Sequence, residues 1–375
     1  MDNLKIKKLV IVTTVPETIA TILQGQPKWL SRYTEIICVT SSGVEFERAR
    51  NMESVEFYAI EMLRGISPFH DLISIFKMWR LFRQLEPDAV HSYTPKAGMV
   101  SIIAGYLAAV PFRIHTFTGL IFPSSKGLKR KVLIFIDRLI CLLATHIIPE
   151  GEGVKSDLVN HRITQKPLTV IGYGNIAGVD VEHYRPLSDC ESNAHDPQRF
   201  TFCYIGRLNR DKGIQELVSA FVKLRNEPKL ILVGKLDETA PISSETTNII
   251  MENDRITCTG FLDDIRPILA GSSLLVLPSY REGFPNVLLQ AGAMGLPVIA
   301  SNINGCNEII DDNFNGWLVS PRDVEDLRGK MEHVMSISQG ELAVMGFNAR
   351  ARVVERYERS VYLNKLFEFY QEIAN

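Results

Sequence analysis

The sequence predicts an α/β protein with two domains, each built on a doubly wound parallel sheet. Three observations support this prediction. Short β-branched, apolar segments alternate with helical periods along the whole chain. The alternation occurs twice, on either side of a polar stretch at 187–198 that is typical of a domain boundary. The length of 375 residues is sufficient for two hydrophobic cores.

Composition excludes several classes of protein. The chain is 46% hydrophobic and 22% charged, which is typical of a folded globular protein and not of a disordered one. Its net charge of −2 gives no reason to expect a nucleic-acid partner. Residues 1–187 hold 22 basic and 17 acidic side chains, and the remainder holds 19 and 26. A basic first half and an acidic second half suggest different partners for the two.

Cysteine usage and hydropathy favour a cytoplasmic protein without a membrane span. The six cysteines show neither C-x-x-C nor zinc-ligand spacing, so we expect reduced core cysteines. The apolar start is too short for a signal peptide and is interpreted as a first strand. The most apolar segment, 132–148, is interrupted by Asp137, Arg138 and His146.

The first domain is expected over 1–186, joined by a final helix at about 360–375. Strands are predicted at 8–13, 36–40, 55–60, 88–91, 112–116 and 147–148, and helices at 71–85, 97–109 and 126–143. The loop at 14–17 after the first strand lacks glycine. The G-x-G-x-x-G fingerprint is therefore absent there, which disfavours a dinucleotide enzyme.

The segment 126–143 begins with lysines and becomes densely apolar. One interpretation is a core helix with solvated lysines at its start. The other is a surface that binds anionic lipid, because basic residues beside an apolar face have that property.

The second domain is expected over 187–359. Strands are predicted at 200–205, 230–233, 256–259, 274–277, 298–300 and 316–319. Helices are predicted at 214–224, from Asn286 to Gly295, at 324–335, and at 340–374 with a break near Glu355.

The segment 278–300 reads as a loop, a helix and a buried strand, and it follows a further strand. Such units bind ligands at the carboxyl ends of their strands, and the helix start offers N–H groups to an anion. Glu282 lies in the loop, where its carboxylate could bind a polyol. Gln290 shares a helix face with Asn286. Gly283 permits close backbone approach, whereas Pro285 has no N–H to donate.

Arg207 and Lys212 lie in one loop, between a strand end and a helix start. Two cations beside a helix N-terminus suit a diphosphate, although solvated surface cations are the commoner outcome. His91 and His115 are expected at strand ends facing a ligand. A lone histidine at such a place is more often structural, and the alternative for His115 is a polar contact or an acid/base group. The sequence shows no Ser-His-Asp order, HExxH or Walker loop.

Together these motifs resemble a known family. GRLNRDKG, with its R-x4-K, and the later PSYREGFPNVLLQAGAMGLPVIA are similar to the retaining sugar-nucleotide glycosyltransferases of family 4, which have the GT-B fold. HSYTPKAG, RIHTFTGL and IGYGNIAGVDVEHY resemble the bacterial polysaccharide branch of that family.

The resemblance implies two facing Rossmann-like domains and a last helix that returns to the first. The first domain would bind the acceptor and the second the sugar nucleotide. It assigns the diphosphate to Arg207 and Lys212, and a donor-sugar hydroxyl to Glu282. The donor-binding set is Gly206, Phe261, Gly283, Phe284, Pro285, Asn286, Val287, Leu288 and Gln290.

Two departures from the family pattern concern specific contacts. The family motif is E-x7-E with a second Glu on the ribose, and this chain has Gln290, which lacks the charge. The family often places a His beside the reacting sugar. Here Thr118 stands at that place with His115 three residues earlier, and Lys96 is a further residue on the acceptor side.

The sequence therefore predicts transfer of a hexose or N-acetylhexosamine from a UDP-sugar to a hydroxyl of a growing, lipid-linked glycan, with retention of configuration. The product would be a bacterial capsule or O-antigen. No metal or cofactor is expected, because the cations would stabilise the leaving group. An anionic membrane surface on the cytoplasmic side is an expected partner. A UDP-sugar epimerase of GT-B fold and a non-catalytic sugar-nucleotide binding protein remain alternatives.

Overall fold

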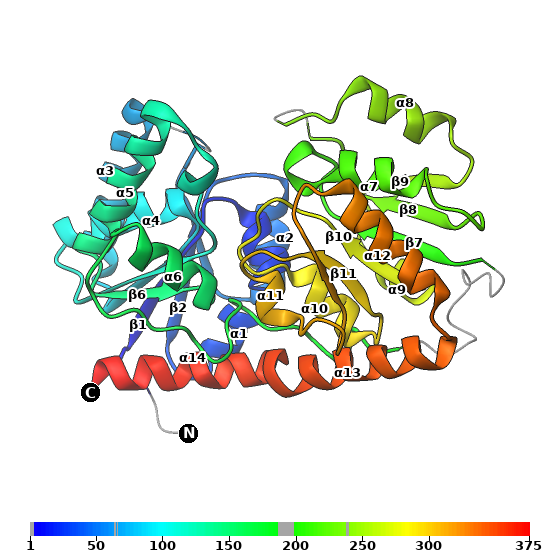
Figure 1. Cartoon of the computed structure of the whole chain (residues 1–375). Helices are drawn as coiled ribbons and strands as arrows, with labels where there is room; N and C mark the ends of the chain where they lie inside the picture. The colour runs from blue at the N-terminus through cyan, green and yellow to red at the C-terminus, as the bar shows by residue number, and fades with distance from the viewer. Residues whose placement is uncertain (1–3, 64, 66, 187–198, 238–239) are drawn as a thin grey trace. The chain divides into compact units, whose positions relative to one another are not determined.

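The computed structural model describes residues 4–63, 65, 67–186, 199–237 and 240–375 (Figure 1). They divide into two compact units. Unit 1 runs to Gly178 and includes Ser360–Asn375, and unit 2 is Val179–Arg359. The predicted linker at 187–198 lies outside the described residues. Unit 2 starts before that linker because Val179 hydrogen-bonds with the backbone of Tyr357 and Arg359, inside unit 2.

Unit 1 contains a six-stranded parallel sheet in the order β3-β2-β1-β4-β5-β6. Its strands are β1 (Lys8–Val12), β2 (Glu35–Thr40), β3 (Glu56–Ala59), β4 (Ala89–Tyr93), β5 (Phe112–Phe117) and β6 (His146–Pro149). β1, β2 and β4 are almost continuously buried, which is typical of parallel strands covered on both faces.

Helices cover both faces of this sheet. They are η1 (Thr18–Ile22), α1 (Gln26–Leu30), α2 (Val44–Glu53), α3 (Pro68–Leu85), α4 (Pro95–Leu107), η2 (Phe122–Ser124), α5 (Gly127–Leu143), α6 (Glu152–Asn160) and α14 (Arg359–Ala374). Alternate residues of β1 enter different cores. Val10 and Val12 pack with α3 and α4, whereas Leu9 and Ile11 share a core with α14.

The chain end belongs to unit 1. Tyr362, Leu366 and Tyr370 of α14 are buried in the core that includes β1. The sequence predicted one helix at 340–374 broken near Glu355, but the break is at Glu358. α13 ends at Tyr357, and Glu358 is extended because this part of the backbone pairs with Val179.

Unit 2 contains a second six-stranded parallel sheet, in the order β12-β11-β10-β7-β8-β9. Its strands are β7 (Thr201–Ile205), β8 (Lys229–Val233), β9 (Ile256–Gly260), β10 (Leu274–Leu277), β11 (Val298–Ser301) and β12 (Trp317–Val319). The two sheets confirm the predicted parallel α/β class.

The helices of unit 2 are η3 (Arg210–Lys212), α7 (Ile214–Phe221), α8 (Ser244–Glu252), α9 (Arg266–Ala270), α10 (Asn286–Ala293), α11 (Cys306–Ile309), α12 (Val324–Ser336) and α13 (Gln339–Tyr357). Gly346 of α13 lies against the carbonyl of Gly295, where a Cβ would overlap the oxygen. Close approach of this kind requires glycine. Among the described helices of the chain, none is both long and apolar enough to cross a membrane.

Candidate functional site

The strand order of unit 2 reverses between β7 and β10. β8 and β9 continue on one side of β7, whereas β10, β11 and β12 lie on the other. Ligands of open parallel sheets bind at the carboxyl ends of the strands where this reversal occurs. The loops at that point are 206–213, after β7, and 278–285, after β10. They contain Arg207, Lys212 and Glu282.

The two loops are held close together. Gly213 has a φ of +70°, and a Cβ there would overlap the carbonyl oxygen of Pro278. Asn209 shapes the first loop, because its side-chain oxygen accepts the N–H of Lys212 at 3.0 Å. The hydroxyl of Tyr204 donates to the carbonyl of Arg207 at 2.8 Å. Burial raises the pKa of Tyr204, which keeps this hydroxyl a donor.

An ion pair joins the loops at the centre of the site. The Nζ of Lys212 lies 2.5 Å from Oε1 of Glu282, and their side chains are only 21% and 12% exposed. The sequence separation of the pair is 70 residues. The structure thus brings together two residues that the sequence assigned to one site on separate grounds.

Arg207 lies at the exposed side of the same loop. Its guanidinium contacts Oδ2 of Asp237 at 2.6 Å, and its side chain is 65% exposed. Asp237 also accepts a hydrogen bond from Asn209 at 3.0 Å. Asp237 therefore holds the cation from the protein side, while the rest of the guanidinium faces solvent.

Tyr280 anchors the loop that carries Glu282. Its N–H donates to the carbonyl of Asp211 at 2.8 Å, and its hydroxyl donates to Glu216 at 2.5 Å. The guanidinium of Arg322 lies 4.5 Å from the centre of the Tyr280 ring. Burial and the Glu216 carboxylate raise the pKa of Tyr280. Tyr280 and Asp211 lie within the quoted motifs but were not predicted as site residues, and Glu216 and Arg322 lie outside those motifs.

The start of α10 follows the Glu282 loop. No side chain caps this helix, and Pro285 precedes its first residue, Asn286. Phe284 and Leu288 are buried and Val287 is half-buried, and the N–H of Leu288 already donates to the carbonyl of Pro285 at 3.1 Å. The carbonyl of Gly283 packs against Gly305, where a Cβ would overlap it.

Gln290 and Phe261 lie at the margins of this region. The Gln290 amide donates to the hydroxyl of Tyr184 at 3.0 Å. Phe261 follows β9 and is 62% exposed, with the Nζ of Lys235 at 5.4 Å from its ring centre. Lys235 and Tyr184 are further residues that the sequence analysis missed.

The two histidines of unit 1 that were predicted to face a ligand are buried instead. His115 lies inside the sheet, where its Nδ1 is 2.9 Å from Ser92 Oγ and its ring lies where a Cβ of Gly98 would be. His91 contacts Thr116 at 2.7 Å and Tyr370 at 2.6 Å. Both are fully buried, and burial lowers the pKa of each to about 3. The prediction that they face a ligand was wrong, and neutral buried imidazoles fit a structural role.

The remaining residues predicted for the acceptor side lie in unit 1. Lys96, in the first turn of α4, contacts Asp71 of α3 at 2.6 Å, and both side chains are nearly buried. Thr118 is half-buried and follows β5. Lys96 is thus neutralised within the fold.

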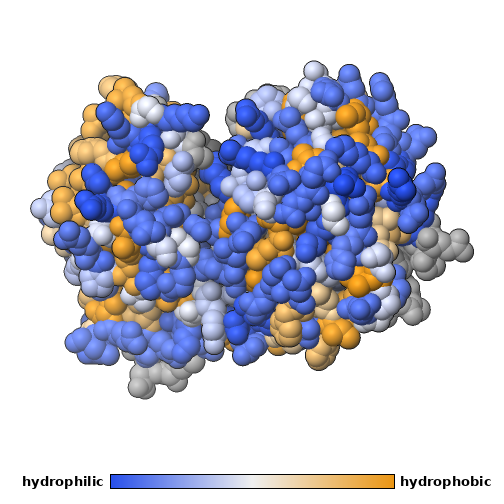
Figure 2. Space-filling model, viewed as in Figure 1, coloured by the Kyte–Doolittle hydropathy of each residue, from blue (hydrophilic) through white to orange (hydrophobic). Residues whose placement is uncertain are grey.

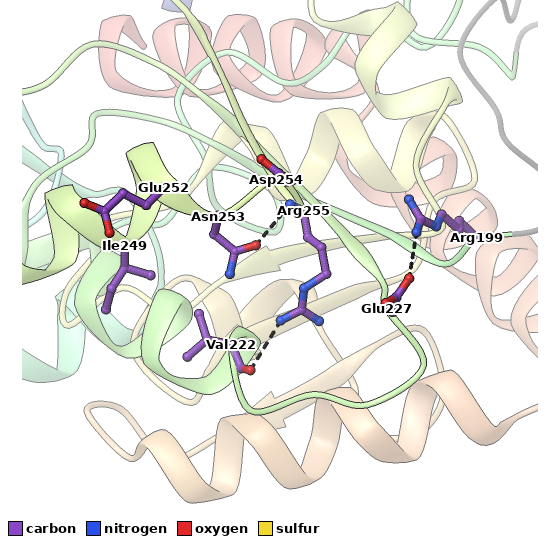
Figure 3. A pocket seen from close by; sticks show the side chains of 8 residues that line it. All are labelled: Arg199, Val222, Glu227, Ile249, Glu252, Asn253, Asp254 and Arg255. Atoms are coloured by element: carbon purple, nitrogen blue, oxygen red, sulfur yellow. Dashed lines mark hydrogen bonds and ion pairs between the residues drawn. The ribbon is translucent and has the colours of Figure 1, made fainter.

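Other ligand chemistries have less support in the described part of the chain. No group of three or more His, Cys, Asp or Glu side chains found there could hold a metal ion. A cavity of about 740 Å³ is lined by residues that include Arg199, Glu227 and Arg255 (Figure 3). The cavity lies at the amino ends of β7, β8 and β9, whereas Lys212 follows the carboxyl end of β7. The Arg199 and Glu227 side chains in its wall already form an ion pair with each other at 2.9 Å.

Two family models match the chain. One, described as glycosyl transferases group 1, matches residues 199–336, and the other, a glycosyl transferase 4-like domain, matches residues 30–174. The first match includes every predicted donor-site residue.

The chain is also similar to curated and solved proteins. The capsular polysaccharide biosynthesis glycosyltransferase CapM of Staphylococcus aureus is 29% identical over 99% of this chain and 97% of its own. The UDP-Gal:alpha-D-GlcNAc-diphosphoundecaprenol alpha-1,3-galactosyltransferase of Escherichia coli is 27% identical over 85% of this chain and 84% of its own. The crystal structure of HepE from Anabaena in complex with UDP has a TM-score of 0.82, at 18% identity, over 97% of this chain and all of that one.

Proposed function

The chain belongs to the group 1 glycosyltransferases with the GT-B fold, and from this premise we propose its reaction. These are nucleotide-sugar-dependent enzymes of polysaccharide biosynthesis. It transfers a hexose or N-acetylhexosamine from a UDP-sugar to a hydroxyl of a lipid-linked glycan, and the anomeric configuration is retained. Bacterial surface polysaccharide is the proposed product.

The observation that carries the proposal is the Lys212–Glu282 pair beside Arg207, at the strand reversal of unit 2. The pair offers a cation and an acceptor carboxylate from adjacent loops. A diphosphate needs the former, and a sugar hydroxyl can donate to the latter. A sugar attached to a diphosphate presents both groups within one short molecule.

The same charges support the chemistry. When the anomeric C–O bond breaks, the bonding electrons leave with the diphosphate, and the sugar acquires oxocarbenium character. Arg207, Lys212 and backbone N–H groups at the start of α10 would stabilise the charge on the leaving group. The acceptor oxygen then bonds to the anomeric carbon on the face that the diphosphate leaves. Its proton passes to the departing phosphate oxygen.

The nucleotide has its own candidate contacts. The exposed ring of Phe261 offers a stacking surface for uracil, with Lys235 beside it. The Gln290 amide, already bonded to Tyr184, would bind a ribose hydroxyl as a neutral group. This contact is weaker than that of a carboxylate because it lacks charge.

The lipid-linked acceptor is proposed from the relatives. The printed name of the Escherichia coli relative gives a diphosphoundecaprenol-linked N-acetylglucosamine as its acceptor. A relative from Campylobacter jejuni is likewise named for a diphospho-undecaprenol-linked sugar. Both transfer an α-1,3-linked sugar according to those names.

The test is a panel of UDP-glucose, UDP-galactose, UDP-N-acetylglucosamine and UDP-N-acetylgalactosamine, each with and without a short-chain polyprenyl-diphosphate saccharide. We expect UDP release that requires both one donor and the acceptor, and an α-linked product by NMR. Isomerisation of the donor without an acceptor would indicate an epimerase. UDP binding without turnover of any donor would indicate a sugar-nucleotide binding protein.

A further inference from the structure

Helices α3 and α5 of unit 1 expose large apolar side chains to solvent. On α3 these are Phe69, Leu72, Ile73 and Phe76, which recur at helical spacing along one stripe. The opposite face of α3 carries Met78, Leu81 and Phe82 and is buried against the sheet. The exposed stripe is therefore a second apolar face. Phe69 alone is 72% exposed.

α5 carries a matching stripe in which apolar and basic residues alternate. Leu128, Lys131, Phe135, Arg138 and Leu142 lie three or four residues apart and are all exposed. Leu128, Phe135 and Leu142 are 76%, 65% and 68% exposed. Figure 2 shows hydrophobic and hydrophilic residues interleaved over the part of unit 1 where Figure 1 places α3 and α5.

The exposed charges within α3 and α5 have one sign. The range 68–85 contains three basic residues and the range 119–143 contains five. The acids of these ranges and of α4 are Asp71 and Asp137, and both are buried. Asp71 is further neutralised by Lys96. By contrast, α12 of unit 2 exposes Glu325 and Glu332, paired with Arg328.

We propose that the exposed faces of α3 and α5 form a docking surface for an anionic lipid bilayer. Basic residues attract the negative surface of the leaflet, and apolar side chains enter the boundary between headgroups and acyl chains. Protein interfaces are depleted of lysine relative to the rest of the surface, so a protein partner fits the composition less well. The docking surface goes beyond the transfer reaction and needs neither donor nor acceptor.

The test is flotation of the full chain with vesicles, without any substrate. We expect binding to vesicles of 30% phosphatidylglycerol in phosphatidylcholine, weaker binding at high salt, and none to phosphatidylcholine alone. Each basic residue contributes roughly fivefold to the partition coefficient, so Lys129→Glu/Lys131→Glu should lower it at least about 10²-fold. Phe69→Ser/Phe76→Ser should lower it by roughly tenfold or more.

Matched control variants lie in unit 2. Arg225→Glu/Lys330→Glu reverses the same number of charges, and Val344→Ser/Phe347→Ser removes two exposed apolar residues of α13. Both controls should float like the unchanged chain. Absence of flotation, or equal loss in test and control variants, would overturn the proposal. So would a dimer in light scattering that Phe69→Ser/Phe76→Ser dissociates while flotation persists, because the face would then bind a second copy.

The result is distinguishable from failure of the proposed reaction. Sugar transfer to a water-soluble, short-chain acceptor needs no bilayer, and α3 and α5 hold none of the proposed donor contacts. We therefore expect both helix variants to keep that transfer rate within about twofold. Vesicle binding and transfer to the soluble acceptor can thus succeed or fail separately.

Discussion

Replacement of Lys212 should separate the structural role of the central ion pair from its role in the reaction. Lys212→Met removes the ammonium group and leaves the Glu282 carboxylate without it, in a site where that side chain is 12% exposed. Breaking a fully buried pair costs about 3–5 kcal/mol, and the residual exposure here reduces the cost to about 2 kcal/mol. In a unit of this size the melting temperature should fall by roughly 5 °C.

The double variant Lys212→Met/Glu282→Gln removes both charges. Its melting temperature should return to within about 2 °C of the parent, because no buried carboxylate then lacks its counterion. Turnover should not return. Loss of one stabilising donor for a developing anion lowers turnover by roughly 10²–10³-fold. The affinity for UDP should fall by about tenfold or more, because a charge-assisted hydrogen bond is lost.

Two measurements on the same samples decide the matter, namely thermal unfolding and UDP release with an acceptor present. The charge-pair account predicts that stability recovers in the double variant and activity does not. If turnover recovered along with stability, Lys212 would only hold the Glu282 loop in place. If neither quantity changed in Lys212→Met, the pair would have no role in either.

Four further outcomes are expected. Arg207→Ala should lower turnover by roughly 10²-fold, which UDP release measures. Gln290→Glu should bind UDP several-fold more tightly in calorimetry, and an unchanged affinity would exclude it from the ribose site. Burial raises the pKa of Asp137 to about 7, so this carboxyl group stays protonated in the folded chain at pH values where it is ionised in the unfolded chain. The free energy of unfolding therefore falls as pH rises through 7. The free energy of unfolding of Asp137→Asn, measured by chemical denaturation, should decline between pH 5 and 8 by about 2–3 kcal/mol less than that of the parent. Burial lowers the pKa of His115, so its effect on stability has the opposite pH dependence. Its contribution to the free energy of unfolding is present above pH 6.5 and is lost as pH falls toward 3. His115→Gln should therefore have a flatter acid limb and should still transfer sugar at pH 7.5.

The residues proposed for the donor site could be predicted from sequence because their position depends on local features. A strand end is visible as the last residue of an apolar run, and Arg207 and Glu282 both follow one closely. The sequence does not reveal which strands are neighbours. The order that places β7 beside β10 is what brings Lys212 to Glu282.

The histidines were misplaced for a physical reason. Parallel strands buried on both faces show no alternation that would distinguish a residue in their middle from one at their end. β5 continues to Phe117, so His115 is an interior residue of the strand. Gly98 leaves room for its ring beneath α4, and sequence alone cannot show that this glycine faces a histidine.

The residues that support the site were missed because their partners are distant in sequence. Tyr280 reaches Glu216 across 64 residues, and Tyr184 lies 106 residues from Gln290, the side chain that donates to it. Each is an ordinary surface residue when read locally. Only the fold gives it a partner.

The apolar stripe of α3 illustrates a different limit of sequence reading. Phe69, Leu72 and Phe76 have the spacing of a core-facing helix, and a core is what that pattern ordinarily predicts. α3 has apolar residues on both faces, so the pattern cannot say which face meets the sheet. The structure places Met78 and Phe82 inside and leaves the Phe69 stripe exposed.

The strand reversals of the two units differ in charge. In unit 1 the reversal lies between β1 and β4, and its loops bring the hydroxyls of Thr14 and Thr94 to 2.6 Å. Thr94 has a φ of +77°, a strained conformation for a β-branched residue that is maintained when the surroundings require it. The corresponding point of unit 2 carries Arg207, Lys212 and Glu282. Neutral hydroxyls suit a saccharide and cations suit a diphosphate, so the contrast supports the proposal that unit 1 binds the acceptor saccharide and unit 2 the donor.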